Sequence, residues 1–343
     1  MQFYLDYLIN KEKLMTLEAF NDKLKCTKLD ARDAKNRPKP FKKRAGNSKY
    51  EGNAGSLRVL SRILTTMLSG ILDDSAVGVH LIKLHELSEI ITAPVLTFEE
   101  INFVMEDIIV EYLDLRIEAV EVLVMPRARP KHHYLSHYSR AFRNIGPLIS
   151  IWAMRMESKH TYFKSVIRTS KNFKNVSLTC SQRHQRAQVS YCYFGLFPRS
   201  KFEIPDSSPI AEDLLKVAVD PFMKAFVKDL DPKSLVPKYI KIYGTNYEGG
   251  KVLVIKKEEH GRLKVGFIKA ISYFNNIVQF VVKTFEASQS KYGSYVTTKF
   301  LSENEIVDYD LLADYHPLEM LGPSHSFSFI LHHYISTYMN ERV

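Results

Sequence analysis

The sequence predicts an α+β protein, with a mainly helical N-terminal two-thirds followed by a small antiparallel β domain. In the first two-thirds, apolar residues recur at intervals of three and four, the spacing of one helix face, as Leu57, Leu60 and Leu64 illustrate. From Tyr239 the apolar period changes to two, the spacing of one strand face. A proline-rich stretch separates the two patterns and predicts the main domain boundary.

We therefore predict four regions along the chain. N-terminal helices and a basic loop occupy 1–55, and a helical module occupies 56–195. A linker with one helix, from Ala211 to Phe226, spans 196–238, and a small β-barrel-like domain or open sheet spans 239–335.

Local signals set the boundaries within the helical regions. Thr16 is the expected N-cap of a helix that ends near residue 24. Thr97 and Glu100 have capping-box spacing and begin the third of three scaffold helices between 56 and 123, whose acids we expect on a solvated face. The segment 127–190 should hold three helices, interrupted at Pro130, Gly146-Pro147 and Asn172–Asn175.

Ten Lys and Arg residues lie in the stretch 25–55, together with Pro38, Pro40, Gly46 and Gly52. We expect an exposed basic loop without fixed structure. Its core, 35–44, is either a nuclear import signal or a solvated linker.

Five short strands are expected after residue 238, with Gly249-Gly250 and Asn275-Asn276 as hairpin turns. The expected strands are Tyr239–Tyr243, Lys251–Lys256, Val265–Ile271, Val278–Phe285 and Ser294–Phe300.

The formal net charge of +10 is confined to one window. Between Arg127 and Gln188 there are thirteen Lys and Arg residues against one acid, Glu157, so this window carries +12 and the rest of the chain is close to neutral. A local excess of this kind is typical of a nucleic-acid footprint, and an acidic protein partner is the alternative.

Composition excludes several classes of protein. An apolar fraction of 45% supports a packed core, and three cysteines without a CxxC pair predict neither a disulfide framework nor a zinc–thiolate site. No apolar run reaches the ~18 residues of a membrane span, and the N-terminus lacks the features of a secretory signal. We expect a soluble nuclear or cytoplasmic protein with no membrane partner.

Glu157 is the one carboxylate in this basic field, and on a helix it shares a face with His160 and Lys164. An ionised carboxylate there could hold a divalent cation, but two-metal phosphoryl chemistry needs several carboxylates. The alternative is an ion pair with Lys164 or Arg155.

Three histidines form a second candidate site. His133 and His137 are four residues apart and, with His132 or His160, offer ligands for a transition metal. The alternative is a structural role, because the glutamate of an HExxH motif is absent.

Cations interleaved with aromatic residues suggest phosphate contacts combined with base stacking. No P-loop, dinucleotide-binding loop or nucleophile elbow occurs. The candidate nucleic-acid-binding residues are Arg129, Lys131, Arg155, Lys159, Lys164, Lys171, Lys174 and Arg183.

The central block resembles a conserved segment of the animal relatives of CACTA (En/Spm) transposases. The residues that carry the resemblance are Pro130-Lys-His-His-Tyr-Leu-Ser-His-Tyr138, Gly146-Pro-Leu148, Trp152, Met154-Arg-Met-Glu-Ser-Lys-His-Thr-Tyr-Phe-Lys164, Asn172-Phe-Lys-Asn175 and Gln182-Arg-His-Gln185.

The resemblance implies an RNase H-like domain with a DDE-type carboxylate triad, interrupted by a helical insertion. Glu157 matches the position of the final triad carboxylate. Because no strand pattern precedes Leu57 that could carry the two aspartates, we expect the chain to begin after them and to be catalytically incomplete on its own.

The sequence thus predicts a nucleic-acid-binding remnant of a transposase, with DNA as the preferred ligand. The alternative is a protein-interaction module, in which the helices or the terminal β domain capture a partner. A third hypothesis is a subunit that completes a nuclease in trans, with Glu157 as a ligand of Mg²⁺ or Mn²⁺. No other cofactor is predicted.

Overall fold

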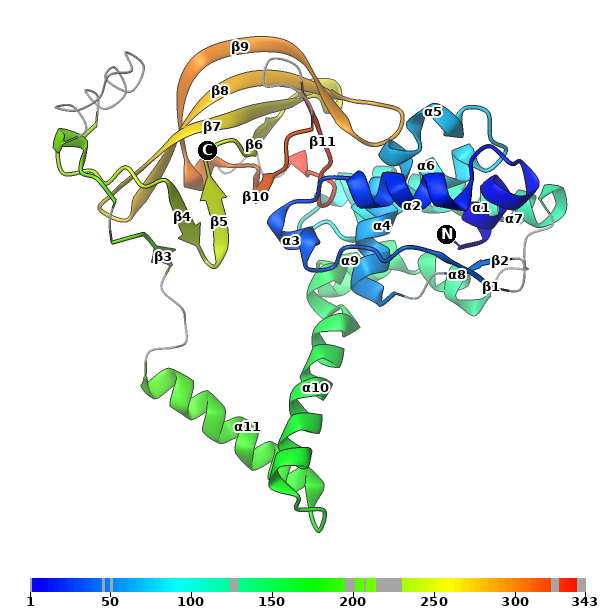
Figure 1. Cartoon of the computed structure of the whole chain (residues 1–343), viewed down its shortest axis with the longest axis horizontal. Coiled ribbons are helices and arrows are strands. Elements are labelled where there is room, and N and C mark those ends of the chain that lie inside the picture. The colour runs from blue at the N-terminus through cyan, green and yellow to red at the C-terminus, as the bar shows by residue number, and fades with distance from the viewer. Residues whose placement is uncertain are drawn as a thin grey trace.

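Helices occupy the N-terminal part of the chain and antiparallel sheets the C-terminal part, which confirms the α+β prediction (Figure 1). The computed structural model describes residues 2–44, 47–49, 52–123, 129–194, 201–206, 208–213, 230–321 and 327–337. Of the helix expected from Ala211 to Phe226, only the first turn, at 211–213, falls within these ranges.

The helical body comprises the elements from residue 2 to residue 151. Its α-helices are α1 (Gln2–Asp6), α2 (Leu17–Cys26), α3 (Ala31–Ala34), α4 (Ala54–Met67), α5 (Ser69–Leu72), α6 (Gly78–Ile91), α7 (Glu106–Val122), α8 (Pro130–Leu135) and α9 (Tyr138–Ile145). Two π-helical segments, Tyr7–Lys11 and Glu100–Met105, a 3₁₀ turn, Leu148–Ile151, and the short hairpin β1 (Lys42–Arg44) and β2 (Asn47–Lys49) complete it.

Two apolar clusters hold the helical body together. One joins α1 and α2 to α4 through fully buried side chains such as Leu5, Phe20 and Leu64. The other joins α6, α7 and α9 around residues such as Ile90 and Phe142. The cap expected at the start of α2 is present, since the Ala19 amide donates to Thr16 Oγ1 at 3.1 Å.

Two expectations for the helical regions are wrong. The stretch 25–44 is ordered, because Asp30, Asp33 and Phe41 are buried and Phe41 packs edge-on against Phe20 at 5.3 Å. Its cations had suggested a loop, yet the Arg37 side chain donates to the carbonyl oxygen of Thr27 at 3.0 Å and thereby helps to fix the turn.

Glu100 is the second exception. It forms the expected capping box, since the Glu100 amide donates to Thr97 Oγ1 at 3.1 Å. Its carboxylate, however, is buried rather than solvated, because the C-terminal segment, residues 327–337, covers it.

The β part contains a six-stranded antiparallel sheet in the order β10-β6-β7-β8-β9-β11 and a three-stranded sheet in the order β3-β4-β5. The strands are β3 (Phe202–Glu203), β4 (Tyr239–Ile242), β5 (Thr245–Glu248), β6 (Val252–Lys257), β7 (Leu263–Phe274), β8 (Ile277–Gln289), β9 (Tyr295–Asp308), β10 (Asp314–Leu318) and β11 (Ser328–Phe329).

The six-stranded sheet is strongly curved (Figure 1). One apolar cluster packs it against the C-terminal segment, through Phe285 and Phe327, and another packs it against β4 and β5, through Phe280 and Tyr247. Leu321 and Ser328 exchange two backbone hydrogen bonds of 2.8 Å, which link the end of β10 to β11.

One predicted hairpin turn is confirmed and one is wrong. Asn275 and Asn276 have φ values of 47° and 66° and connect β7 to β8, as a type I′ turn requires. Gly249-Gly250 instead connects the two sheets, because the unpredicted strand β5 pairs with β4.

The β part contacts the helical body through the turn between β8 and β9 and through the C-terminal segment, among other contacts. The turn between β8 and β9 contacts α5, where Lys291 Nζ lies 2.7 Å from a carboxylate oxygen of Asp73. The C-terminal segment lies against α3 and α4, where Arg62 Nε donates to the carbonyl oxygen of Leu331 at 2.8 Å.

Candidate functional site

The most basic part of the chain forms a helical hairpin that projects away from the rest of the molecule (Figure 1). Its arms are α10 (Ala153–Ser170) and α11 (Val176–Tyr193). Lys171 adopts the left-handed conformation that ends α10, with φ 50°, and the Asn175 side chain caps α11 by accepting from the Leu178 amide at 3.2 Å. The break predicted at Asn172–Asn175 is therefore confirmed.

The two arms share a narrow contact. The rings of Tyr162 and Phe163 lie 5.9 and 5.8 Å from the His184 ring. Val166 is the one buried side chain described on α10 and α11. Most of the hairpin surface is therefore exposed to solvent.

The hairpin presents cations and aromatic rings together. Tyr193 and Phe173 are 83% and 71% exposed. Within the described part of the chain, no ion pair involves the cations of the hairpin, and all those whose side chains are described are exposed. These are Lys159, Lys164, Arg168, Lys171, Lys174, Arg183 and Arg186. Such a surface can contact phosphates and stack on bases.

Two predicted contact residues lie outside the hairpin and one cannot be placed. Arg129 and Lys131 are exposed at the start of α8. Arg155 lies on α10, but its side chain is outside the described set, as are those of all residues from 154 to 158.

The single tryptophan of the chain, Trp152, contacts the helical body at the start of α10. Trp152 lines an apolar groove of about 510 Å³ with Leu57, Leu84 and Ile151, and the Arg58 guanidinium lies 5.2 Å from the centre of its ring. The tryptophan of the basic block therefore attaches the hairpin to the helical body.

The candidate catalytic residue, Glu157, lies on α10, as predicted. Its side chain, like those of the other residues from 154 to 158, is not among those that the structure describes. The histidine site is brought together only in part. His133 and His137 are exposed, with their Nε2 atoms 3.2 Å apart, but His160 belongs to neither potential metal-ligand group found among the described residues.

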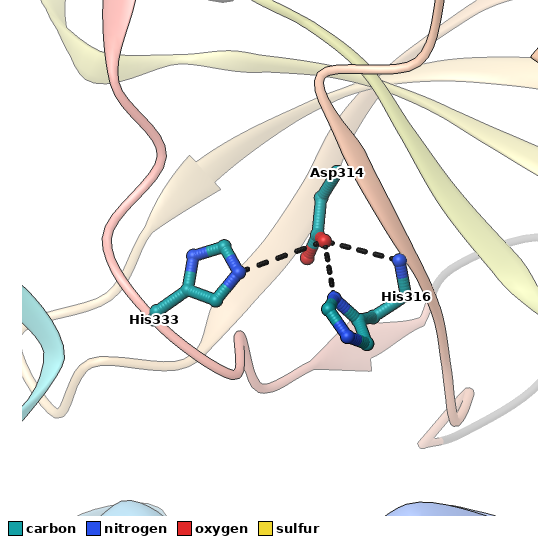
Figure 2. Close-up of side chains that lie close together, drawn as sticks. All are labelled: Asp314, His316 and His333. Atoms are coloured by element: carbon teal, nitrogen blue, oxygen red, sulfur yellow. Dashed lines mark hydrogen bonds and ion pairs between the residues drawn. The ribbon is translucent and has the colours of Figure 1, made fainter. Parts of the chain in front are cut away.

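Sequence reasoning missed a cluster of one aspartate and two histidines in the β part. Asp314 and His316 are two residues apart on β10, so their side chains lie on the same face of the strand. His333 comes from the C-terminal segment (Figure 2). Asp314 Oδ1 lies 2.8 Å from His316 Nδ1 and 3.6 Å from His333 Nε2. The spacing of two between Asp314 and His316 on a strand was the one local signal for this group.

The electrostatics of this cluster favour an ionised aspartate. Burial by itself would raise the pKa of Asp314, but the two imidazoles hold it well below its ordinary value. Burial lowers the pKa of His333, whereas the Asp314 charge raises it, and the net direction is upward.

A neighbouring cluster joins the β part to the helical body. His332 Nε2 lies 3.1 Å from a carboxylate oxygen of Asp30, and the Arg62 guanidinium pairs with Asp33. All four residues are buried. Burial and the Arg62 charge lower the pKa of His332, whereas its contact with Asp30 raises it, and the net direction is downward.

No protein-family model, curated protein or solved structure matches this chain. Among the residues that the structure describes, no helix is both long and apolar enough to cross a membrane.

Proposed function

We propose that this chain binds nucleic acid, with DNA as the preferred ligand, through the α10–α11 hairpin. The observation that carries the proposal is the row of exposed cations without ion-pair partners in the described structure, set among exposed aromatic rings. A basic face that only kept the protein in solution would not need Tyr193 and Phe173 exposed beside it.

The spacing of the cations supports phosphate contacts. Lys164 and Arg168 are four residues apart and share a face of α10, and Lys171 lies at the C-cap of this helix, at the tip of the hairpin. Lys174 continues this row into the turn.

We further propose that the chain derives from a DDE-type transposase of the CACTA class and is not catalytically complete on its own. The support is the sequence block, which runs from α8 into α11. Before α10, the strands within the described ranges are the three-residue strands β1 and β2.

The test is a titration of the full chain against labelled double- and single-stranded DNA at 50 and 200 mM salt. For a protein that contacts six or more phosphates, affinity should fall by roughly 10³-fold over this range. Neutralising Lys164, Lys171 and Lys174 to Gln should reduce the slope of log affinity against log salt by about 0.9 per lost contact on duplex DNA.

A matched control removes the same kind of charge elsewhere. Lys233, Lys238 and Lys299 are exposed lysines of the β part, and the triple variant Lys233→Gln/Lys238→Gln/Lys299→Gln should bind like the unmodified chain. Equal losses in both variants would show that only net charge matters, and absence of binding at 50 mM salt would refute the proposal.

The competing function is capture of a protein partner by the helices or the β part. Exposed apolar side chains on α11, Leu178 and Val189, favour it. In that case binding to the partner would persist at 200 mM salt and after neutralisation of the three lysines.

A further inference from the structure

The Asp314 carboxylate is buried with one of its two oxygens unused. Asp314 is 2% exposed, and its Oδ2 atom has no hydrogen-bond partner among the residues that the structure describes. The other oxygen, Oδ1, accepts from the backbone amide of His316 at 3.0 Å and faces both imidazoles. An unsatisfied buried carboxylate oxygen is costly, so a missing partner is expected at this position.

The His333 ring is oriented as a metal ligand would be. Its Nδ1 atom lies 3.0 Å from the carbonyl oxygen of Tyr334 and donates to it, which leaves Nε2 pointing toward Asp314. The 3.6 Å between Nε2 and Asp314 Oδ1 is longer than a hydrogen bond. A backbone carbonyl that fixes the far nitrogen of an imidazole is the usual second partner of a metal-binding histidine.

The three groups are close enough to share one ion. One ligand atom from each of Asp314, His316 and His333 lies within 4.8 Å of the other two. Two ligands of a tetrahedral ion with bonds of about 2.1 Å are about 3.4 Å apart, so sub-ångström shifts would suffice. The His316 side chain is 32% exposed, so this edge of the group is in contact with solvent.

We propose that Asp314, His316 and His333 bind one divalent transition-metal ion of the Zn²⁺ type. Two imidazole nitrogens and one carboxylate suit Zn²⁺ and Co²⁺, whereas Mg²⁺ and Ca²⁺ prefer sites made of oxygen alone. The neighbouring group of Asp30, Asp33 and His332 is not such a site, because Asp33 is already paired with the Arg62 guanidinium and Asp30 with His332.

The ion would fix the joint between the two parts of the protein. His333 belongs to the same segment as Leu331 and His332, which contact Arg62 and Asp30 of the helical body. A metal bond from β10 to His333 would therefore hold this segment in the position in which it contacts α3 and α4.

The experiment is Co²⁺ and Zn²⁺ titration of the metal-stripped full chain, followed by visible absorption for Co²⁺ and calorimetry for Zn²⁺. We expect one ion per chain and a rise in melting temperature with Zn²⁺ but not with Mg²⁺. Asp314→Asn and His316→Gln should each weaken binding by at least about 100-fold, since each removes a direct ligand. His316→Gln should disturb folding less than Asp314→Asn, because the His316 side chain is partly exposed.

Three controls separate this site from the other histidines and from Glu157. His260→Gln, at an exposed turn, the double variant His133→Gln/His137→Gln and Glu157→Ala should all keep the high-affinity ion. Binding that survives in folded Asp314→Asn and His316→Gln but disappears in the His133/His137 double variant would overturn the proposal. So would the absence of any stoichiometric ion in the unmodified chain.

Discussion

Gly293, in the turn between β8 and β9, is a position where a single methyl group matters. Its φ is +83°, and a Cβ atom would overlap the imidazole of His85. His85 is itself buried on α6, 3.4 Å from a carboxylate oxygen of Glu89, and cannot move aside into solvent. The absence of a side chain is therefore what allows this turn to lie on the helical body.

Gly293→Ala should lower the free energy of unfolding by about 2–4 kcal/mol, from overpacking together with the strain of a positive φ. Urea denaturation followed by circular dichroism measures this. Gly250→Ala is the matched control, because φ is +88° there but nothing lies within 4 Å of the added methyl group. The control should lose only the backbone contribution of about 1 kcal/mol, and equal losses would contradict a contact with His85.

At the scale of elements, β7 and β8 were predictable because they are rich in β-branched and aromatic residues and flank the Asn275-Asn276 turn. β5 was not, since in Thr245-Asn-Tyr-Glu248 only Tyr247 is a large apolar residue, and its burial comes from tertiary packing. β9 extends to Asp308, whereas we predicted its end at Phe300, because the polar residues of its second half do not indicate a strand.

The two candidate sites also differ in how far the sequence alone predicts them. The basic hairpin is continuous in the sequence, so composition and turn residues were enough to locate it. The metal-ligand group depends on the path of the C-terminal segment beside β10, and no local pattern encodes that path. Likewise, the order of residues 25–44 depends on partners such as Arg62 that are distant in sequence.

The α10–α11 hairpin should exchange its amide hydrogens faster than the large sheet. Because Val166 is the one buried side chain described on these helices, opening them exposes little apolar surface. We expect protection factors at least about tenfold lower in α10 and α11 than in β7 and β8. Hydrogen–deuterium exchange with mass spectrometry at two protein concentrations tests this. If α10 and α11 were as strongly protected as β7 and β8 at both concentrations, the hairpin would be stabilised by packing that its exposure does not indicate.

At the scale of the whole molecule, Glu100 connects three regions. Its carboxylate accepts from the Thr97 amide at 3.0 Å and the Thr337 amide at 2.9 Å, it accepts from the Ser336 hydroxyl, and Lys257 Nζ lies 3.8 Å away. Burial by itself would raise the pKa of Glu100, but these hydrogen bonds and the Lys257 charge lower it below its ordinary value.

A depressed pKa in the folded state means that ionised Glu100 stabilises the protein above the pKa of the unfolded chain, about 4.5, and that this contribution is lost as pH falls further. Glu100→Gln should therefore reduce the free energy of unfolding by about 1–3 kcal/mol at pH 7. The difference between the two proteins should shrink below pH 4.5. Denaturation curves from pH 3 to 7 measure it, and a difference that is constant with pH would exclude an electrostatic role for Glu100.

The reach of the C-terminal segment has a consequence for synthesis of the protein. Arg62 donates to a carbonyl 269 residues later in the chain, and Glu100 binds an amide 237 residues later. While the ribosome is still translating the β part, α4 and the helix that begins at Glu100 have buried polar groups whose partners do not yet exist. The helical body can collapse early but should reach its final packing only after translation of residues 331–337, which makes the nascent chain a natural client for chaperones.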